Sequence, residues 1–363
     1  MHLSQALGII NITAPEQVQT LADLLPPDLI QQAFSLTDTV TLRKRKLPLE
    51  SMVWLVIGMA IYNNRPLSQI VNLMDIVDRT GRPFTAPSSV IQRRKTLGED
   101  PIKTLFKLTA DYWHQEARHP LWHGLKLLGV DGVVWRTPDT PENEAAFGKS
   151  RTQHGDTAYP HEEIRKLGRQ DRLVKLKTSP QSRKQWDGLP EEVIARLIVR
   201  TIKGKEREVL TSLTDTMRYP AADVSELYQH RWEIELGYWE VKQELLGNRW
   251  TLRSKLPEMV RQELWGVLLT YNLVRYQMVK MAFNLKGDYL PYQLSFSGTI
   301  SEILRLLIGL PLCSAGAVPG HLKYFYELAG SLVLPGRRER SYPRELKSLK
   351  RKYPIKNNAG HLK

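Results

Sequence analysis

The most constraining feature of the sequence is the segment 228–242, in which an aromatic hydroxyl, two cations and a carboxylate recur at helical spacing. Tyr228, Arg231, Glu235 and Lys242 are separated by two, three and six residues. At about 100° per residue, these spacings place all four side chains within an arc of roughly 60° on one helix. A carboxylate in such a stripe can hold a divalent metal ion while the neighbouring cations hold phosphates.

A simpler explanation of the same spacing is an amphipathic helix whose charges form an i,i+3 and i,i+4 ladder in open water. The other acids of the stretch project to the opposite side, and apolar rows flank the polar stripe on both sides. These flanks favour a stripe that lines a cleft over one that faces bulk solvent.

The charge balance points to a polyanionic partner. The chain has 363 residues, a formal net charge of +14 and an isoelectric point near 9.7. An excess of one sign this large favours nucleic acid. The single cysteine, Cys313, excludes an intramolecular disulfide and a cysteine-based zinc site. The apolar run 52–62 is too short to cross a bilayer, so we expect a buried helix and no membrane contact. The expected location of the protein is the cytoplasm, in association with the nucleoid.

The N-terminal third is predicted to be helical. Proline-initiated helices precede and follow the apolar run 52–62, and the segment 66–97 has the outline of a helix, a turn and a recognition helix. The last of these helices carries Arg93, Arg94 and Lys95, which we expect to bind DNA. The alternative is a basic surface helix in an ordinary bundle.

The middle of the chain is predicted to alternate strands and helices. Residues 125–134 have the pattern of a buried strand that carries Asp131 near its end. Further strands are expected at 172–178, 193–202 and 206–213, and helices from about 220 to 282. The basic run 337–352 is expected to be an arm that follows phosphates, with a solvated tail as the alternative.

The spacing Tyr-x2-Arg-x3-Glu-x6-Lys resembles the signature of bacterial insertion-sequence transposases of the DDE type, the Tyr-Arg-Glu-Lys group of the insertion-sequence-four type. The match is complete at residues 228, 231, 235 and 242. Residues 125–132 resemble the first catalytic strand of that family, and residues 247–265 resemble its final helices. The segment from Leu24 to about Phe106 resembles its helical N-terminal domain, so the resemblance covers most of the chain.

The resemblance implies an α/β fold with an all-helical N-terminal domain and a ribonuclease H-like core that contains a β-rich insertion. The expected division is a DNA-binding domain at 1–120, the first part of the core at 121–160, the insertion at 161–215, the second part of the core at 216–290, and C-terminal helices with a basic tail at 291–363.

The resemblance also implies a chemistry. Asp131 and Glu235 would bind Mg²⁺, with Mn²⁺ as a substitute, in a two-metal site for cutting and joining DNA. Tyr228 and Arg231 would contact phosphates of the transposon end, and Lys242 would neutralise a phosphate near the scissile bond. The implied partners are the terminal inverted repeats and the target, both double-stranded DNA, and a second copy of the chain in a transposon-end complex.

The sequence departs from the family at the second catalytic aspartate, which is missing. After residue 160 the sequence changes abruptly to segments that resemble the β-rich insertion of the family. This change predicts an internal deletion near Pro160–His161 and an incomplete ribonuclease H-like core. We expect impaired catalysis. The alternatives are a substitute carboxylate from Asp139 or Asp156, a DNA-binding remnant or inhibitor that does not cut, and a helical protein whose charge serves RNA binding.

Overall fold

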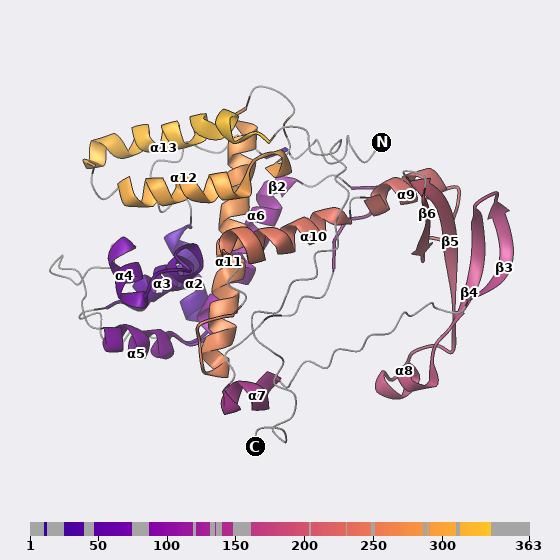
Figure 1. Cartoon of the computed structure of the whole chain (residues 1–363), viewed down its shortest axis with the longest axis horizontal. Coiled ribbons are helices and arrows are strands. Elements are labelled where there is room, and N and C mark those ends of the chain that lie inside the picture. Colours follow the sequence, from indigo (N-terminus) through magenta and orange to yellow (C-terminus); the bar gives the residue numbers. More distant parts are fainter. Residues whose placement is uncertain are drawn as a thin grey trace, which may run out of the picture. The chain divides into compact units, whose positions relative to one another are not determined.

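The structure is a computed structural model (Figure 1), and it is described for most of the first 334 residues. Residues 1–333 form one compact unit, and residues 334–363 form another, of which only Leu334 is described. The basic run 337–352 therefore lies outside the described residues. The described ranges are 11–12, 25–39, 47–74, 87–118, 121–130, 135, 140–147, 161–202, 205–229, 231–247, 251–285, 289, 291–309 and 313–334.

The N-terminal part is helical, as the sequence predicts. Proline supplies the residue that precedes or begins most of these helices, because its fixed φ suits a first turn that needs no amide donor. A short antiparallel pair joins β1 (Asn11–Ile12) to β2 (Ala117–Arg118). The helices are α2 (Pro27–Leu36), α3 (Leu49–Ile61), α4 (Leu67–Leu73), α5 (Pro87–Leu97) and α6 (Asp100–Glu116).

Helix α3 contains the apolar run 52–62 up to Ile61, and nine of its thirteen residues are buried. The prediction of a buried helix at this position is confirmed. A helix that is apolar around its whole circumference must be covered on all sides, and α3 packs against α4, α5 and the long helix α11 (Pro257–Phe283).

Helix α11 contributes residues to two hydrophobic cores. In Figure 1 it runs between the N-terminal helices and the last two helices. Leu269, Leu273 and Tyr276 recur at helical spacing and belong to the core of the N-terminal helices. Val274 and Met278 lie in a second core with α12 (Phe296–Gly309) and α13 (Val318–Glu327). One helix therefore connects the N-terminal helices to the C-terminal pair.

The sheet is a four-stranded antiparallel meander in the order β3-β4-β5-β6. The strands predicted near 172, 193 and 206 are confirmed as the last three, and the connection after Ile202 pairs it with Lys205. The first strand was not predicted. The strands are β3 (His161–Gly168), β4 (Asp171–Lys177), β5 (Glu192–Ile202) and β6 (Lys205–Thr211), with α8 (Pro180–Gln185) between β4 and β5.

A buried ion pair crosses the sheet between neighbouring strands. The guanidinium of Arg196 on β5 donates to both carboxylate oxygens of Asp171 on β4, at 2.8 and 2.6 Å, and to the carbonyl of Tyr219 at 2.6 Å. Only 1% of the Arg196 side chain is exposed. A buried guanidinium is tolerated because its donors are bound in a fixed fork. The pair therefore ties the sheet to the chain that leads into the signature segment.

Candidate functional site

The segment 221–247 is not the single α-helix that the spacing predicts. Helix α9 (Ala221–Gln229) ends before Arg231, α10 (Trp232–Trp239) follows, and the next turn, η2 (Glu240–Leu245), is a π-helix. The amide of Leu246 donates to the carbonyl of Val241, five residues earlier, at 3.0 Å. The four signature residues therefore do not lie on one continuous α-helix, and a uniform 100° per residue does not apply through the widened turn that contains Lys242.

Three of the four signature side chains do meet. The guanidinium of Arg231 lies 2.7 Å from the carboxylate of Glu235, one turn later. The same guanidinium carbon lies 5.8 Å from the centre of the Tyr228 ring. Both members of the ion pair are partly exposed, at 42% for Arg231 and 35% for Glu235. Lys242 is half-buried in the π-helical turn.

A polar cluster on α11 holds the junction between α10 and the π-helical turn. The Glu240 carboxylate lies 2.7 Å from the Arg275 guanidinium and accepts a hydrogen bond from the Tyr271 hydroxyl at 3.2 Å. Arg275 also donates to the Tyr271 oxygen at 3.0 Å. Burial raises the pKa of Tyr271 above its usual value of 10.0. These residues are not predictable from the sequence, because only tertiary packing brings Tyr271 and Arg275 to the signature segment.

The same hydroxyl marks a close approach of the two helices. A Cβ atom added to Gly237 of α10 would lie 3.0 Å from the Tyr271 oxygen. A larger residue at this position would require the Tyr271 side chain to move. Gly237 was not recognised as part of the site, although a glycine inside a helical pattern is a signal of close packing.

The segment 125–134 differs most from its prediction as a buried strand. Residues 121–130 are described, and the segment forms only an isolated bridge between Trp122 and Leu125. Leu128 is 79% exposed and Val130 is 89% exposed. The prediction of a buried strand is therefore wrong for these residues, because no neighbouring strand covers them among those described. Asp131, Asp139 and Asp156 lie outside the described residues.

Residues 125–130 nevertheless contact helix α10 of the signature segment. A Cβ atom added to Gly129 would lie 2.5 Å from the Cδ1 atom of Ile234. Gly129 is two residues before Asp131, and Ile234 is adjacent to Glu235. The backbone that leads to the first predicted carboxylate therefore contacts the helix that carries the other.

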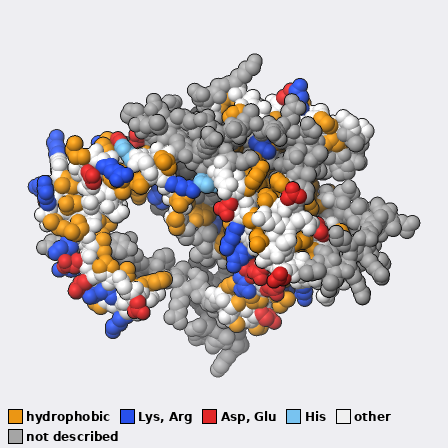
Figure 2. All heavy atoms as spheres, turned by 180° about the vertical axis from the view of Figure 1, so that it is seen from behind, with side chains coloured by type: hydrophobic (Ala, Val, Ile, Leu, Met, Phe, Trp, Pro, Cys, Tyr) orange, Lys and Arg blue, Asp and Glu red, His pale blue; other side chains and the backbone are white. Residues whose placement is uncertain are grey.

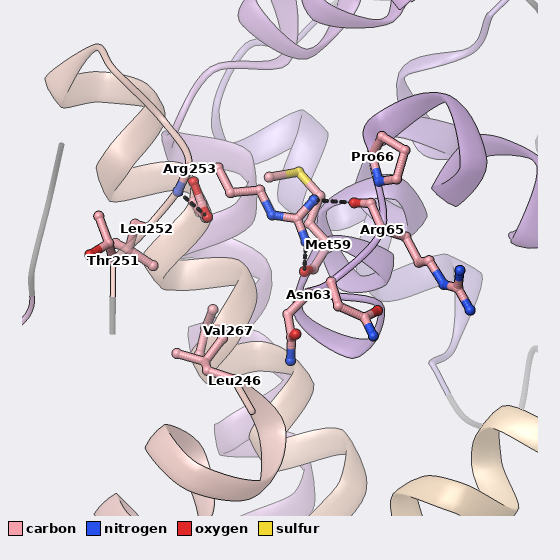
Figure 3. A pocket seen from close by; sticks show the side chains of 11 residues that line it. Met59, Asn63, Arg65, Pro66, Leu246, Thr251, Leu252, Arg253 and Val267 are labelled. Atoms are coloured by element: carbon pink, nitrogen blue, oxygen red, sulfur yellow. Dashed lines mark hydrogen bonds between the residues drawn. The ribbon is translucent and has the colours of Figure 1, made fainter. Parts of the chain in front are cut away.

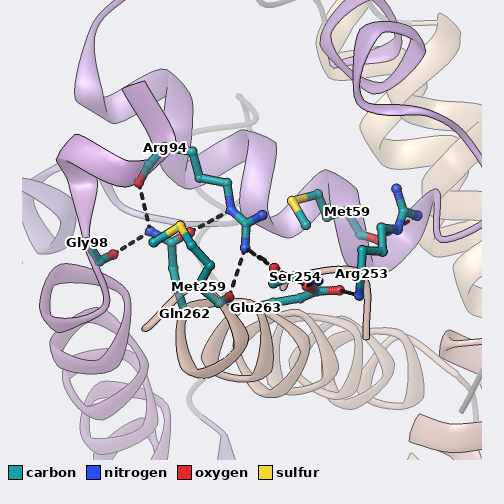
Figure 4. Close-up of polar contacts among 8 residues, drawn as sticks. All are labelled: Met59, Arg94, Gly98, Arg253, Ser254, Met259, Gln262 and Glu263. Atoms are coloured by element: carbon teal, nitrogen blue, oxygen red, sulfur yellow. Dashed lines mark hydrogen bonds and ion pairs between the residues drawn. The ribbon is translucent and has the colours of Figure 1, made fainter. Parts of the chain in front are cut away.

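The basic helix α5 does not present all of its cations to solvent. Arg94 is only 6% exposed, and Figure 4 shows its guanidinium pointing into a polar cluster with α11. It donates to the side chains of Gln262 at 2.6 Å and Ser254 at 3.0 Å, and burial lowers its pKa. The prediction that Arg94 contacts DNA does not fit this position, because its donors are already bound inside the protein.

The two neighbours of Arg94 differ from it. The Nε atom of Arg93 donates to the Leu47 carbonyl at 2.8 Å, and its side chain is half-buried. Lys95 is exposed. Of the three cations predicted on this helix, Lys95 is thus the one that the described structure leaves at the surface.

A pocket of about 310 Å³ lies where the N-terminal helices meet the chain after the signature segment (Figure 3). Arg253 crosses it and donates to the carbonyls of Arg65 at 2.7 Å and Tyr62 at 3.0 Å, at the end of α3. Asn63 donates to the Leu245 carbonyl at 2.6 Å. These bonds fasten the signature segment to the N-terminal helices. The other lining residues include Met59, Asn64, Pro66, Leu246, Thr251, Leu252, Glu263 and Val267.

Cations also gather on the first hairpin of the sheet. Figure 2 shows Lys and Arg side chains along the part of the surface that the sheet forms. Arg165, Lys166 and Arg169 on this hairpin are all exposed. An exposed basic hairpin adds to the surface on which phosphates could be neutralised.

The described residues contain one of the two predicted metal ligands. Glu235 offers a partly exposed carboxylate oxygen, which is the kind of donor that Mg²⁺ prefers. Its present partner is Arg231, so an ion would have to share or displace this contact. Within the described ranges, no group of three or more His, Cys, Asp or Glu side chains is placed to hold a metal ion. No helix in the same ranges is long and apolar enough to span a bilayer.

Comparison with known proteins defines the class to which this architecture belongs. The family model "Insertion element 4 transposase N-terminal" matches residues 15–107, and the model "Transposase DDE domain" matches residues 141–273. The chain belongs to the insertion element 4 family of DDE transposases. A DDE domain implies a ribonuclease H-like fold and the use of divalent metal ions.

Two relatives from Escherichia coli illustrate the family. The chain is 43% identical to "Transposase InsG for insertion sequence element IS4" over 433 aligned positions, which cover 98% of each chain. It is 33% identical to "Putative transposase InsZ" over 150 positions, which cover 40% of this chain and 48% of the relative. No solved structure matches the chain.

The alignment with the first relative is longer than the chain itself. It has 433 positions, whereas the chain has 363 residues, so at least 70 aligned positions of the relative have no counterpart here. Because the alignment covers 98% of both chains, these positions lie within the alignment and not beyond its ends.

Proposed function

We propose that this transposase binds the ends of its insertion element through the surface formed by Tyr228, Arg231 and Lys242, but cannot complete DNA cutting and joining. The observation that carries the first half is the cluster around Arg231, in which a partly exposed guanidinium, a phenol ring and a carboxylate meet. The backbone at Gly129, two residues before Asp131, contacts Ile234 of the same segment. The net charge of +14 supports a phosphate-rich partner.

The second half of the proposal rests on the length of the chain. At least 70 positions of the relative are missing here, and the predicted junction at Pro160–His161 would remove the second aspartate and the strands around it. In this proposal Asp131 and Glu235 hold Mg²⁺, or Mn²⁺ in its place. Two such ions would activate the attacking oxygen and stabilise the leaving oxygen of a phosphodiester. Two carboxylates hold such a pair of ions less firmly than three.

The proposed partners are double-stranded DNA of the terminal inverted repeats and the target, with a second copy of the chain in the transposon-end complex. Lys95 on α5 extends the basic surface, whereas Arg93 is half-buried and Arg94 is excluded by its burial. Binding of this kind would associate the protein with the nucleoid in the cytoplasm.

The test measures DNA binding and DNA cleavage separately. The purified chain is incubated with a linear duplex that carries the ends of the element, and binding is measured by mobility shift between roughly 50 and 200 mM salt. We expect an affinity that falls steeply with salt. Cleavage at the element boundary is then assayed in Mg²⁺ and in Mn²⁺, and we expect no free 3′-hydroxyl at that boundary.

The two halves of the proposal, DNA binding and the loss of cleavage, can be contradicted independently. A salt-independent affinity would contradict a phosphate-dominated interface. Boundary-specific cleavage that is lost in Asp131→Ala would contradict the impairment, and would mean that another carboxylate, such as Asp139 or Asp156, completes the site.

A second candidate function follows from the same missing positions. A chain that occupies transposon ends without cutting them would inhibit an intact transposase of the same element. Adding this chain to a cleavage reaction of the intact enzyme should lower the yield as the ratio of the two chains rises. An unchanged yield at a tenfold excess would count against inhibition.

A further inference from the structure

Residues 127–130 form an apolar stretch that belongs to no helix or strand. All four residues are exposed, at 36% for Leu127, 79% for Leu128 and 89% for Val130. Among the described residues, the backbone of 126–130 pairs with no strand.

One residue of this stretch lies against the signature segment. Gly129 approaches Ile234 of α10 so closely that an added Cβ atom would lie 2.5 Å from its Cδ1 atom. The stretch is thus in contact with α10 at Gly129, while the side chains of Leu128 and Val130 are exposed. An unpaired apolar stretch of this kind offers main-chain groups to which another extended chain can add as a strand.

The missing sequence indicates which chain that is. A relative with 43% identity has at least 70 positions that have no counterpart here. Removal of a packed segment exposes the apolar surface that it covered. Leu128 and Val130 are exposed, although side chains of these types are usually buried. A second copy of this chain lacks the same positions, so it cannot supply that segment.

We infer that residues 126–130 form a docking edge for an extended apolar strand from the segment that the full-length relative has and this chain lacks. The strand would be supplied by a separate, intact transposase chain. This inference rests on the proposed internal deletion. Main-chain hydrogen bonds would provide the affinity, and Leu128 and Val130 would provide the apolar contacts.

The experiment uses the full chain and synthetic peptides. Overlapping fluorescent peptides cover the positions of the InsG sequence that have no counterpart in this chain, and each is titrated with the full-length protein while anisotropy is recorded. We expect saturable binding by one or a few overlapping peptides. Hydrogen exchange of the amides of 126–130 should slow when such a peptide is bound, because new ladder bonds protect them.

Two matched surface variants identify the docking edge. Val130→Lys should weaken peptide binding at least tenfold, because it places a charge in the apolar contact. Met217→Lys is the control: Met217 is 90% exposed, comparable with the 89% of Val130, but lies outside this segment. It should leave peptide binding unchanged.

Several outcomes would overturn the inference. Absence of saturable binding by every peptide, or equal losses in the two variants, would remove the docking edge. Dimerisation of the chain without peptide, abolished by Val130→Lys, would identify a second copy as the occupant. The mobility shift with DNA is measured without peptide, so failure of the proposed DNA binding remains distinguishable from failure of this inference.

Discussion

The guanidinium of Arg231 and the carboxylate of Glu235 lie 2.7 Å apart, one helical turn from each other, at the start of α10. Because both side chains are partly exposed, an i,i+4 pair of this kind stabilises the helix by only about 0.3–0.5 kcal/mol. The contact is therefore weak enough for a phosphate to take over Arg231 and for a metal ion to take over Glu235.

Replacement of Arg231 by glutamine should weaken DNA binding in a salt-dependent way. Loss of one phosphate contact lowers the slope of log affinity against log salt by about one. Titrations at several salt concentrations measure that slope. Arg305→Gln is the matched control, because Arg305 also forms a short ion pair within its helix, at 2.6 Å to Glu302. Equal changes in both variants would mean that Arg231 contributes only general charge.

Replacement of Arg94 should affect folding more than DNA binding. The Arg94 guanidinium lies 4.0 Å from the buried Glu263 carboxylate. Arg94→Ala leaves this carboxylate without the cation, and breaking a buried pair in this way costs about 3–5 kcal/mol. Urea unfolding measures the loss. Lys95→Ala, on the exposed side of the same helix, should stay within about 0.5 kcal/mol. A small loss in Arg94→Ala would show that Ser254 and backbone amides satisfy Glu263 without it.

The crossing of α11 over α3 predicts opposite effects of the same substitution at two glycines. A Cβ atom at Gly266 would collide with the Val56 side chain and lie 3.4 Å from the Val56 carbonyl oxygen. Gly266→Ala should therefore destabilise the protein by about 1–3 kcal/mol through overpacking. A Cβ atom at Gly320 on α13 would meet nothing within 4 Å, so Gly320→Ala should stabilise it by up to about 1 kcal/mol.

Thermal or urea unfolding of the two glycine variants gives the signs directly. No change in Gly266→Ala would mean that α3 and α11 do not approach as closely as described, and destabilisation by Gly320→Ala would mean that the surface of α13 at Gly320 is not open.

Parts of the fold that depend on local pattern could be predicted from the sequence. Strands β4, β5 and β6 contain short apolar runs rich in β-branched residues, and α3 contains the continuous apolar run from Met52 to Ile61. Strand β3 was missed because Ile164 and Leu167 are its only large apolar residues and its neighbours are mostly charged. A strand of that kind is recognised by its pairing with β4, which the sequence does not display.

The parts of the site that depend on distant contacts could not be predicted. In the sequence Arg94 stands in a basic run, whereas in the structure it is bound by Gln262 and Ser254, more than 150 residues later. The π-helical turn that contains Lys242 likewise accompanies the contact of Glu240 with Arg275. The meeting of Tyr228, Arg231 and Glu235 was predictable, because it depends on spacing within one short segment.

The hydroxyl of Tyr271 gives the last prediction, which concerns alkaline pH. Burial raises the pKa of Tyr271 above 10.0 in the folded protein, so the folded state keeps this proton at pH values at which the unfolded state has lost it. Stability from this group is therefore fully present below about pH 10 and declines as pH rises toward the folded pKa. Tyr271→Phe should lose about 0.5–1.5 kcal/mol at neutral pH, because one buried hydroxyl no longer bonds Glu240.

The variant should also lose less stability than the parent chain when the pH is raised from about 9 to above 10, because the titrating group is gone. Urea unfolding of both proteins at each pH measures the difference, and titration of all other groups cancels in the comparison. Tyr324→Phe, at a 52% exposed position, is the control and should keep the parental decline. Identical declines in the parent chain and Tyr271→Phe would mean that the Tyr271 hydroxyl is not buried against Glu240 and Arg275, and that another contact holds the α10 junction to α11.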